Sequence, residues 1–154
     1  MKRSLLLLCL VLASHGIMAQ ASVGYYPWSG LLSVSTNPRR ILWLDTRVQT
    51  NSLFSSLNLD LLPLINIRRG EVAQWYLGGG LRLNPLYRIV DPKAKVITLD
   101  GYSLNVGVRA APFASDRRIQ VALELNPYVR NDLANGVLKS HFGLVYHFAE
   151  RKRE

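Results

Sequence analysis

The stretch Lys139-Ser-His-Phe-Gly-Leu-Val-Tyr-His-Phe148 alternates two kinds of side chain along its whole length and ends on an aromatic residue. In an extended strand, neighbouring side chains point to opposite faces. One face then carries Phe142, Leu144, Tyr146 and Phe148. A tilted β-strand crosses a bilayer in about 9 to 11 residues, so the stretch predicts a strand of membrane-crossing length.

The first residues have the composition of a removable secretory signal. Lys2 and Arg3 precede an apolar run from Leu5 to Ala13, and residues 19–21 supply the small side chains that a signal peptidase recognises. The run is too short for a membrane-spanning helix, which needs about 17 to 25 residues. The one cysteine, Cys9, lies in this run. Cleavage after Ala19, Gln20 or Ala21 would in each case remove this cysteine. We therefore expect a signal peptide within residues 1–21 and a mature chain without disulfide or thiol chemistry.

Length and composition indicate one secreted domain. The chain has 154 residues, enough for one domain rather than two, and 49% of them are hydrophobic. Its formal net charge of +9 would suit nucleic acid, but a secreted protein meets anionic lipid headgroups and lipopolysaccharide instead. Solubility alone explains the charge equally well. We expect outer-membrane lipids and lipopolysaccharide as partners, and no nucleic acid.

The period-two pattern recurs in six further segments, which predicts a chain composed mainly of β-strands. They are Leu31 to Thr36, Ile41 to Thr50, Leu57 to Arg68, Trp75 to Asn84, Tyr102 to Pro112 and Ile119 to Asn126. Pro63 lacks a backbone donor, which predicts a bulge or a gap in its strand. The triplet of residues 78–80 is all glycine, which predicts a bend or a close approach of two backbones.

The polar faces of these segments carry three acids and three arginines at mid-strand positions. They are Asp45, Arg47, Asp60, Arg82, Arg109 and Glu124. In a closed barrel with its apolar face toward lipid, the six would lie in the lumen and neutralise one another. A soluble β-sandwich or lipocalin would place them in water and the apolar face inside. The aromatic terminal strand favours the first arrangement, so we expect a lumenal charge network.

These features resemble the small bacterial outer-membrane β-barrel proteins of the OmpA and OmpX type over about residues 22–148. Tyr146 and Phe148 resemble the terminal signal that the barrel-insertion machinery recognises. The resemblance implies an all-β fold, an eight-stranded antiparallel up-and-down transmembrane β-barrel located in the outer membrane, and we expect a monomer. Residues 149–154 would then form a short basic periplasmic tail.

Seven strand segments are visible, whereas a single-chain bacterial barrel has an even number. We prefer Val23 to Trp28 as the eighth strand, because it returns the N-terminus to the periplasmic side. The alternative is Lys95 to Leu99, folded as a hairpin onto the strand at Tyr102 through Asp100 and Gly101.

Basic clusters recur at every second strand end. They are Arg39 and Arg40, Arg68 and Arg69, Arg117 and Arg118, and Arg151, Lys152 and Arg153. Two crossings return the chain to the same side, so we expect one basic rim. The resemblance implies a periplasmic C-terminus and hence a periplasmic rim. The connections Asn51 to Ser56, Pro85 to Gly101 and Pro127 to Leu138 then lie on the outer side, where such barrels carry longer loops.

Catalytic chemistry has little support in the sequence. Ser140 and His141 are neighbours in a strand and point to opposite faces, so they do not form a nucleophile and base pair. Ser103 with His141 and an acid such as Glu124 remains an alternative catalytic group. No spacing indicates a metal site, and we expect no cofactor. Since an eight-stranded barrel is just wide enough for side chains to fill it, continuous diffusion through it is not expected.

The expected function is that of a non-enzymatic envelope protein with a filled polar lumen and a structural or loop-presenting role. One alternative is a lipid-modifying outer-membrane enzyme of the lipid A deacylase or acyltransferase type. The other is a soluble secreted barrel that binds a ligand.

Overall fold

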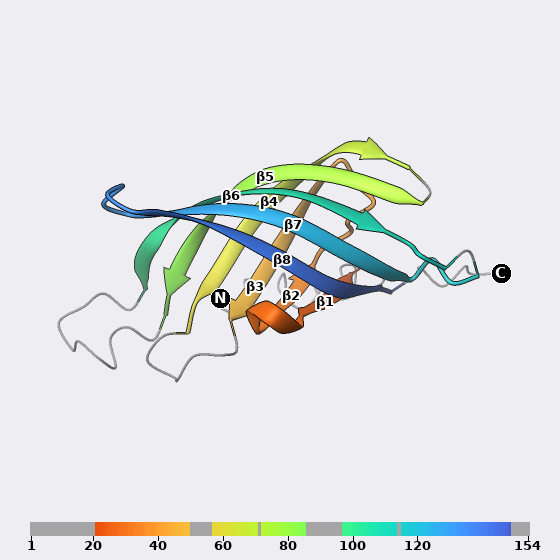
Figure 1. Cartoon of the computed structure of the whole chain (residues 1–154), viewed down its shortest axis with the longest axis horizontal. Helices are drawn as coiled ribbons and strands as arrows, with labels where there is room; N and C mark the ends of the chain where they lie inside the picture. Colours follow the sequence, from red (N-terminus) through yellow and green to blue (C-terminus); the bar gives the residue numbers. More distant parts are fainter. Residues whose placement is uncertain (1–20, 50–56, 71, 86–96, 114, 149–154) are drawn as a thin grey trace, which may run out of the picture.

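The computed structural model describes residues 21–49, 57–70, 72–85, 97–113 and 115–148. Within these ranges, eight antiparallel strands pair in chain order and close into one barrel (Figure 1). They are β1 (Ser22–Tyr26), β2 (Leu31–Ser35), β3 (Leu42–Gln49), β4 (Leu59–Arg69), β5 (Ala73–Asn84), β6 (Thr98–Ala110), β7 (Ile119–Arg130) and β8 (Gly136–His147). The predicted all-β, eight-stranded, up-and-down barrel is confirmed.

The barrel closes where β1 pairs with β8, and this pairing confirms that the eighth strand starts near Val23. The strand ends at Tyr26, because Pro27 begins the short 3-10 helix η2 (Pro27–Ser29). Gly30 then reverses the chain in the left-handed region, with φ of 54°. The alternative hairpin at Asp100 and Gly101 is wrong, since β6 runs through both residues without a turn.

Polar and apolar side chains are distributed over the two faces of the sheet in the opposite way to that of a soluble barrel. In β6, Leu104 and Val106 face outward and are 62% and 49% exposed, whereas Asn105 and Arg109 face inward and are 0% and 1% exposed. The other strands repeat this arrangement, with Leu44, Ile65, Leu77, Leu123, Phe142 and Leu144 among the exposed outward side chains. The interior is therefore largely polar and the outer surface apolar.

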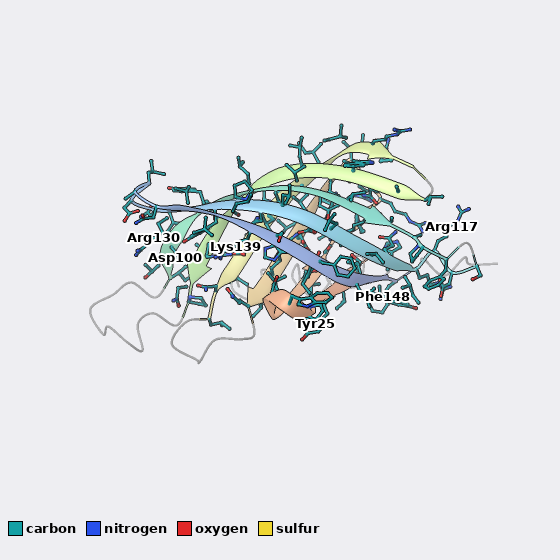
Figure 2. The ribbon with its side chains drawn as sticks, viewed as in Figure 1. Tyr25, Asp100, Arg117, Arg130, Lys139 and Phe148 are labelled. Atoms are coloured by element: carbon teal, nitrogen blue, oxygen red, sulfur yellow. The ribbon has the colours of Figure 1, made fainter. Side chains whose placement is uncertain are left out.

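The two ends of the barrel carry different connections. The basic end, as we call it, carries the connections β2–β3, β4–β5 and β6–β7 together with residues 21 and 148. The opposite end carries η2 and the β3–β4, β5–β6 and β7–β8 connections. Arg117 and Phe148 lie at the basic end, and Asp100 and Arg130 lie at the opposite end (Figure 2).

The prediction of a long loop from Pro127 to Leu138 is wrong. β7 continues to Arg130 and β8 begins at Gly136, so only residues 131–135 form the turn. Pro127 sits inside β7 although it cannot donate a backbone hydrogen bond. The side-chain amide of Asn126 donates to the carbonyl of Leu104 on β6 at 2.8 Å instead. The β5–β6 loop is also shorter than predicted, because β6 already begins at Thr98.

Pro63 and the glycine triplet are explained by the same pair of strands. The β4–β5 ladder skips Leu62 and Pro63 and resumes in the same register at Leu64 and Gly78. A Cβ on Gly78 would collide with the carbonyl oxygen of Pro63. The predicted gap and close approach of backbones are therefore confirmed, while the bulge in β4 lies between Asn66 and Arg68.

The barrel wall is taller on one side than on the other. The hairpin of β7 and β8 extends well beyond β1 and β2, which are five residues each (Figure 1). β1 pairs only with residues 144–147 of β8. The part of β8 nearer the opposite end is instead contacted by η2, where the Trp28 and Phe142 rings lie 5.4 Å apart. η2 thereby carries Ser29 toward the interior side of β8.

Candidate functional site

The six charged residues predicted to face the lumen are all buried inside the barrel, with at most 6% of any of them exposed. The structure brings them together in two groups rather than one. Asp45, Arg47, Arg109 and Glu124 form a central network, while Asp60 and Arg82 form a separate ion pair nearer the opposite end. Each group contains as many acids as arginines.

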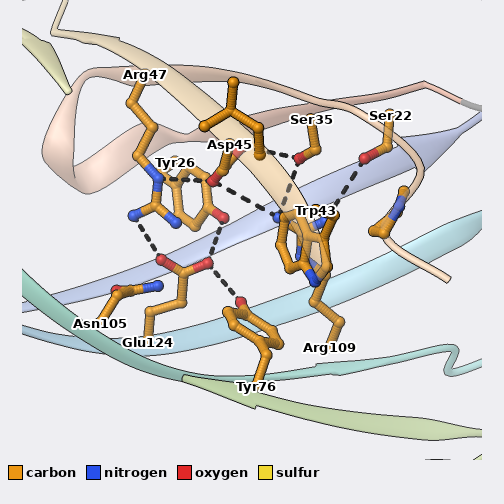
Figure 3. A network of polar contacts seen from close by, with 12 residues as sticks. Ser22, Tyr26, Ser35, Trp43, Asp45, Arg47, Tyr76, Asn105, Arg109 and Glu124 are labelled. Carbon is orange, nitrogen blue, oxygen red and sulfur yellow. Dashed lines mark hydrogen bonds and ion pairs between the residues drawn. The ribbon is translucent and has the colours of Figure 1, made fainter. Parts of the chain in front are cut away.

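Glu124 is the centre of the first group (Figure 3). Its Oε1 accepts hydrogen bonds from the hydroxyls of Tyr26, at 2.8 Å, and Tyr76. Its Oε2 lies 2.6 Å from Nη1 of Arg47. The same arginine bonds Asp45 through Nε at 2.7 Å, so one guanidinium bridges two carboxylates. Charge-assisted bonds of this kind are stronger than neutral ones.

Arg109 connects this network to the basic end. Its Nη2 lies 3.8 Å from Asp45, and its guanidinium stacks over the rings of Trp43 and Tyr76 at 4.6 and 5.4 Å. Cation–π contacts are strongest where water is excluded. A buried charge is tolerated only when it is paired in this way, so the central network fills the lumen without leaving an excess charge.

The second group lies between β4 and β5. Asp60 and Arg82 are directly opposite each other in the register and form two hydrogen bonds, at 2.7 and 2.8 Å. The guanidinium stacks over Tyr128 at 4.4 Å, and Tyr128 in turn donates to Asp100 at 2.7 Å. This group ties β4, β5 and β7 together near the opposite end.

Inward-facing glycines make room for the two tyrosines of the central network. A Cβ on Gly107 would lie 2.6 Å from Cζ of Tyr76, and one on Gly143 would lie 2.6 Å from Cδ1 of Tyr26. Neither pair was predicted from the sequence. An aromatic side chain often covers a glycine on the neighbouring strand. The tyrosines and glycines can be seen in the sequence, but they can be paired only when the strand register is known.

Three arginine doublets of the predicted basic rim lie at the basic end, and all six side chains are exposed. Arg151, Lys152 and Arg153 lie outside the described residues. The β2–β3 turn folds into the mouth of the barrel, because the amide of Asn66 donates to the carbonyl of Pro38 at 2.7 Å. The amide of Gln74 donates to the same carbonyl.

The two aromatics predicted as the insertion signal lie on the outer face at the basic end. Tyr146 and Phe148 are 40% and 44% exposed, and their rings meet edge to face with 5.1 Å between centroids. They are therefore accessible from outside the barrel rather than packed in the lumen.

A serine–histidine contact near the opposite end was not predicted. Ser29 Oγ lies 2.6 Å from Nδ1 of His141. Sequence reasoning missed it because 112 positions separate the two residues and η2 could not be placed beside β8. Ser103, the serine considered for this histidine, has no hydrogen-bond partner for its hydroxyl among the described residues. Glu124 is already engaged by two tyrosines and Arg47.

In the described ranges, no cluster of histidine, cysteine and acidic residues has the arrangement to hold a metal ion. In the same ranges, no helix combines the length and apolar character that crossing a bilayer requires. No family model matches the chain, and neither a curated protein nor a solved structure is significantly similar to it.

Proposed function

We propose that this chain is a non-enzymatic integral protein of the bacterial outer membrane, a transmembrane barrel with a structural or loop-presenting role. One observation carries the proposal. A closed barrel with neutralised charges inside presents exposed aliphatic and aromatic side chains on the outer face of every strand. Soluble monomers rarely expose large apolar patches, whereas a bilayer requires them.

Closure supports the same proposal. Lipid offers no hydrogen bonds to a backbone, so an open sheet edge is excluded from a bilayer and a closed barrel is admitted. The outward leucines and valines are about half exposed, so each contributes about 1 kcal/mol on transfer from water into lipid, roughly half of the value for complete burial. Aromatics at the basic end fit the level of the headgroups. They are Trp75, Phe113, Tyr146 and Phe148, all outward or exposed.

The location rests on the expected signal in residues 1–21 and on the terminal aromatics, which suit the barrel-insertion machinery. The role rests on the interior, where side chains of the central network fill the lumen. A filled lumen favours a structural protein over a pore. The tall β7–β8 hairpin, with its exposed tip at residues 131–138, is the surface most available to a partner outside the cell.

Fractionation of cells at normal expression tests the proposal. We expect the protein in the outer-membrane fraction, extractable with detergent, and migrating faster on a gel when it is not boiled. Heat-modifiable migration reports a barrel that stays folded in detergent. Recovery in the soluble periplasmic fraction would instead support the ligand-binding barrel.

The contact between Ser29 and His141 favours a second candidate, a lipid-modifying enzyme of the deacylase or acyltransferase type. A hydroxyl bonded to an imidazole is the minimal arrangement for an activated nucleophile. Mass spectra of lipid A from cells that express the wild type or Ser29→Ala separate the two candidates. The enzyme requires a mass change that Ser29→Ala abolishes and that Ser140→Ala, an exposed serine on the outer face, leaves intact. Identical spectra with and without the protein would dismiss it.

A further inference from the structure

The basic end contains a cavity with cationic walls. Its volume is about 430 Å³, and four arginines line it: Arg39, Arg69, Arg109 and Arg117. They come from the β2–β3 turn, the last residue of β4, the penultimate residue of β6 and the β6–β7 connection. Among the described residues, nine line the cavity and none of these nine carries a carboxylate. The described part of the wall therefore offers guanidinium groups and amides to a molecule that enters.

Arg109 is the deepest of the four and is held in place by the fold. Its side chain is buried, and its Nη1 and Nη2 reach Ser22 and Ser35 at 3.5 and 3.4 Å. Its Nε, however, has no hydrogen-bond partner among the described residues. Leaving a buried charged donor unsatisfied costs free energy. An acceptor in the cavity would remove that cost.

Each of the three exposed arginines in the cavity belongs to an arginine doublet, and only one member of each doublet lines the wall. Arg39, Arg69 and Arg117 line it, and their neighbours Arg40, Arg68 and Arg118 do not. Register fixes part of this selection, since Arg69 lies opposite Gln74, and Gln74 lies opposite Arg109. Gln74 also holds the turn that carries Arg39. The converging geometry is thus built by the fold and is not a loose accumulation of surface charge.

We propose that this cavity binds a phosphate group that carries two negative charges, as a phosphomonoester or a diphosphate. A guanidinium is a planar fork that binds phosphate oxygens in pairs. Several such forks around one cavity can surround a tetrahedral group from different sides. A carboxylate offers one plane and one charge, so it would engage fewer of them. The group can belong to a lipid headgroup or to a soluble phosphate ester, and both present the same chemistry to the arginines.

Calorimetric titration of the purified protein in lauryldimethylamine oxide, a detergent without phosphate, tests this site whether or not the protein resides in a membrane. The probes are inorganic pyrophosphate and mixed micelles that contain phosphatidic acid, with phosphatidylcholine micelles as the comparison. Saturable binding of pyrophosphate assigns the site to soluble phosphates. Binding of phosphatidic acid without binding of pyrophosphate assigns it to a lipid headgroup. If neither binds saturably, the proposal is overturned.

The doublets provide a matched control. The triple variant Arg39→Gln, Arg69→Gln and Arg117→Gln removes the three exposed lining charges and keeps Arg109. The triple variant Arg40→Gln, Arg68→Gln and Arg118→Gln removes the same number of charges from their neighbours. All six side chains are exposed, so both variants should keep the barrel fold, which heat-modifiable migration checks.

One charge-assisted hydrogen bond contributes about a factor of ten to affinity. The lining triple should therefore weaken binding at least about a hundredfold, and the neighbouring triple should leave it close to that of the wild type. An equal loss in both variants would mean diffuse attraction to the basic end and would overturn the site.

Discussion

Single residues decide how closely the strands approach. Gly78 and Gly79 are adjacent in β5, yet a side chain would meet different surroundings at each position. A Cβ on Gly78 would lie 2.8 Å from Cδ2 of Leu64 and would overlap the carbonyl of Pro63, whereas one on Gly79 would lie 3.4 Å or more from its neighbours. A methyl group at Gly78 would therefore overlap atoms of β4, whereas one at Gly79 would make ordinary van der Waals contacts.

We therefore predict that Gly78→Ala destabilises the folded barrel by about 1 to 3 kcal/mol, the usual cost of forcing extra volume into a packed region. Gly79→Ala should change the free energy of unfolding little, because the added methyl group meets no backbone at short distance. Urea unfolding of both variants in detergent measures the difference. Equal effects would show that the strands β4 and β5 are farther apart than the structure places them.

The ion pair between Asp60 and Arg82 gives a second residue-scale prediction. Removing one partner of a buried pair costs about 3 to 5 kcal/mol, because the other charge is left unpaired. Arg82→Leu should therefore destabilise the barrel strongly, while Arg40→Leu, at an exposed position, should not. The double variant Asp60→Leu with Arg82→Leu should recover most of the loss. A double variant that is as unstable as the sum of the two single ones would exclude the pairing.

At the scale of the elements, the alternation of residue types predicted seven of the eight strands, because one face of each strand meets a different environment from the other. The eighth strand, β1, was inferred from the need for an even number of crossings. The strand ends were predicted less well. Pro127 read as a turn, and only the three-dimensional position of Asn126 beside the Leu104 carbonyl explains why β7 continues. Sequence alone could not pair residues so distant in the chain.

The pairing of β1 with β8, which closes the barrel, has the fewest register pairs of the eight strand pairings, and its register can be tested directly. Tyr25 and Leu144 are register partners on the outer face, and opposite residues of paired strands are close enough for a disulfide. Since Cys9 is the only native cysteine, we predict that Tyr25→Cys with Leu144→Cys in a Cys9→Ser background forms an internal disulfide on oxidation. Gel migration without reductant detects it.

The control pair is Tyr25→Cys with Ser140→Cys. Ser140 lies on the same face of β8, four positions away, which is about 13 Å along a strand. That pair should stay reduced. Crosslinking of the control pair and not of the partner pair would show a different register at the seam.

At the scale of the whole molecule, the content of the two faces was predictable and its detailed geometry was not. Mid-strand charges in the sequence marked the polar faces, and the structure places Asp45, Arg47 and Glu124 in mutual contact inside the barrel. Their division into two groups depends on strand register, as does the selection of one arginine from each doublet. The contact of Ser29 with His141 depends on the short β1–β2 hairpin, which no local pattern reveals.

The orientation of the molecule follows from its two ends and gives the last prediction, which rests on the proposed membrane location. The described ranges begin and end at the basic end, whereas the longest connection, between Asn84 and Thr98, and the β7–β8 hairpin lie at the opposite end. If the basic end faces the periplasm, its arginines meet the headgroups of the inner leaflet, where each contributes about 1 kcal/mol of attraction.

Single cysteines at Asn135, in the β7–β8 turn, and at Ser115, in the β6–β7 connection, report the two sides in a Cys9→Ser background. An impermeant maleimide should label Asn135→Cys on intact cells and Ser115→Cys only after the outer membrane is permeabilised. Labelling of Ser115→Cys alone on intact cells would mean that the barrel is inserted in the reverse orientation.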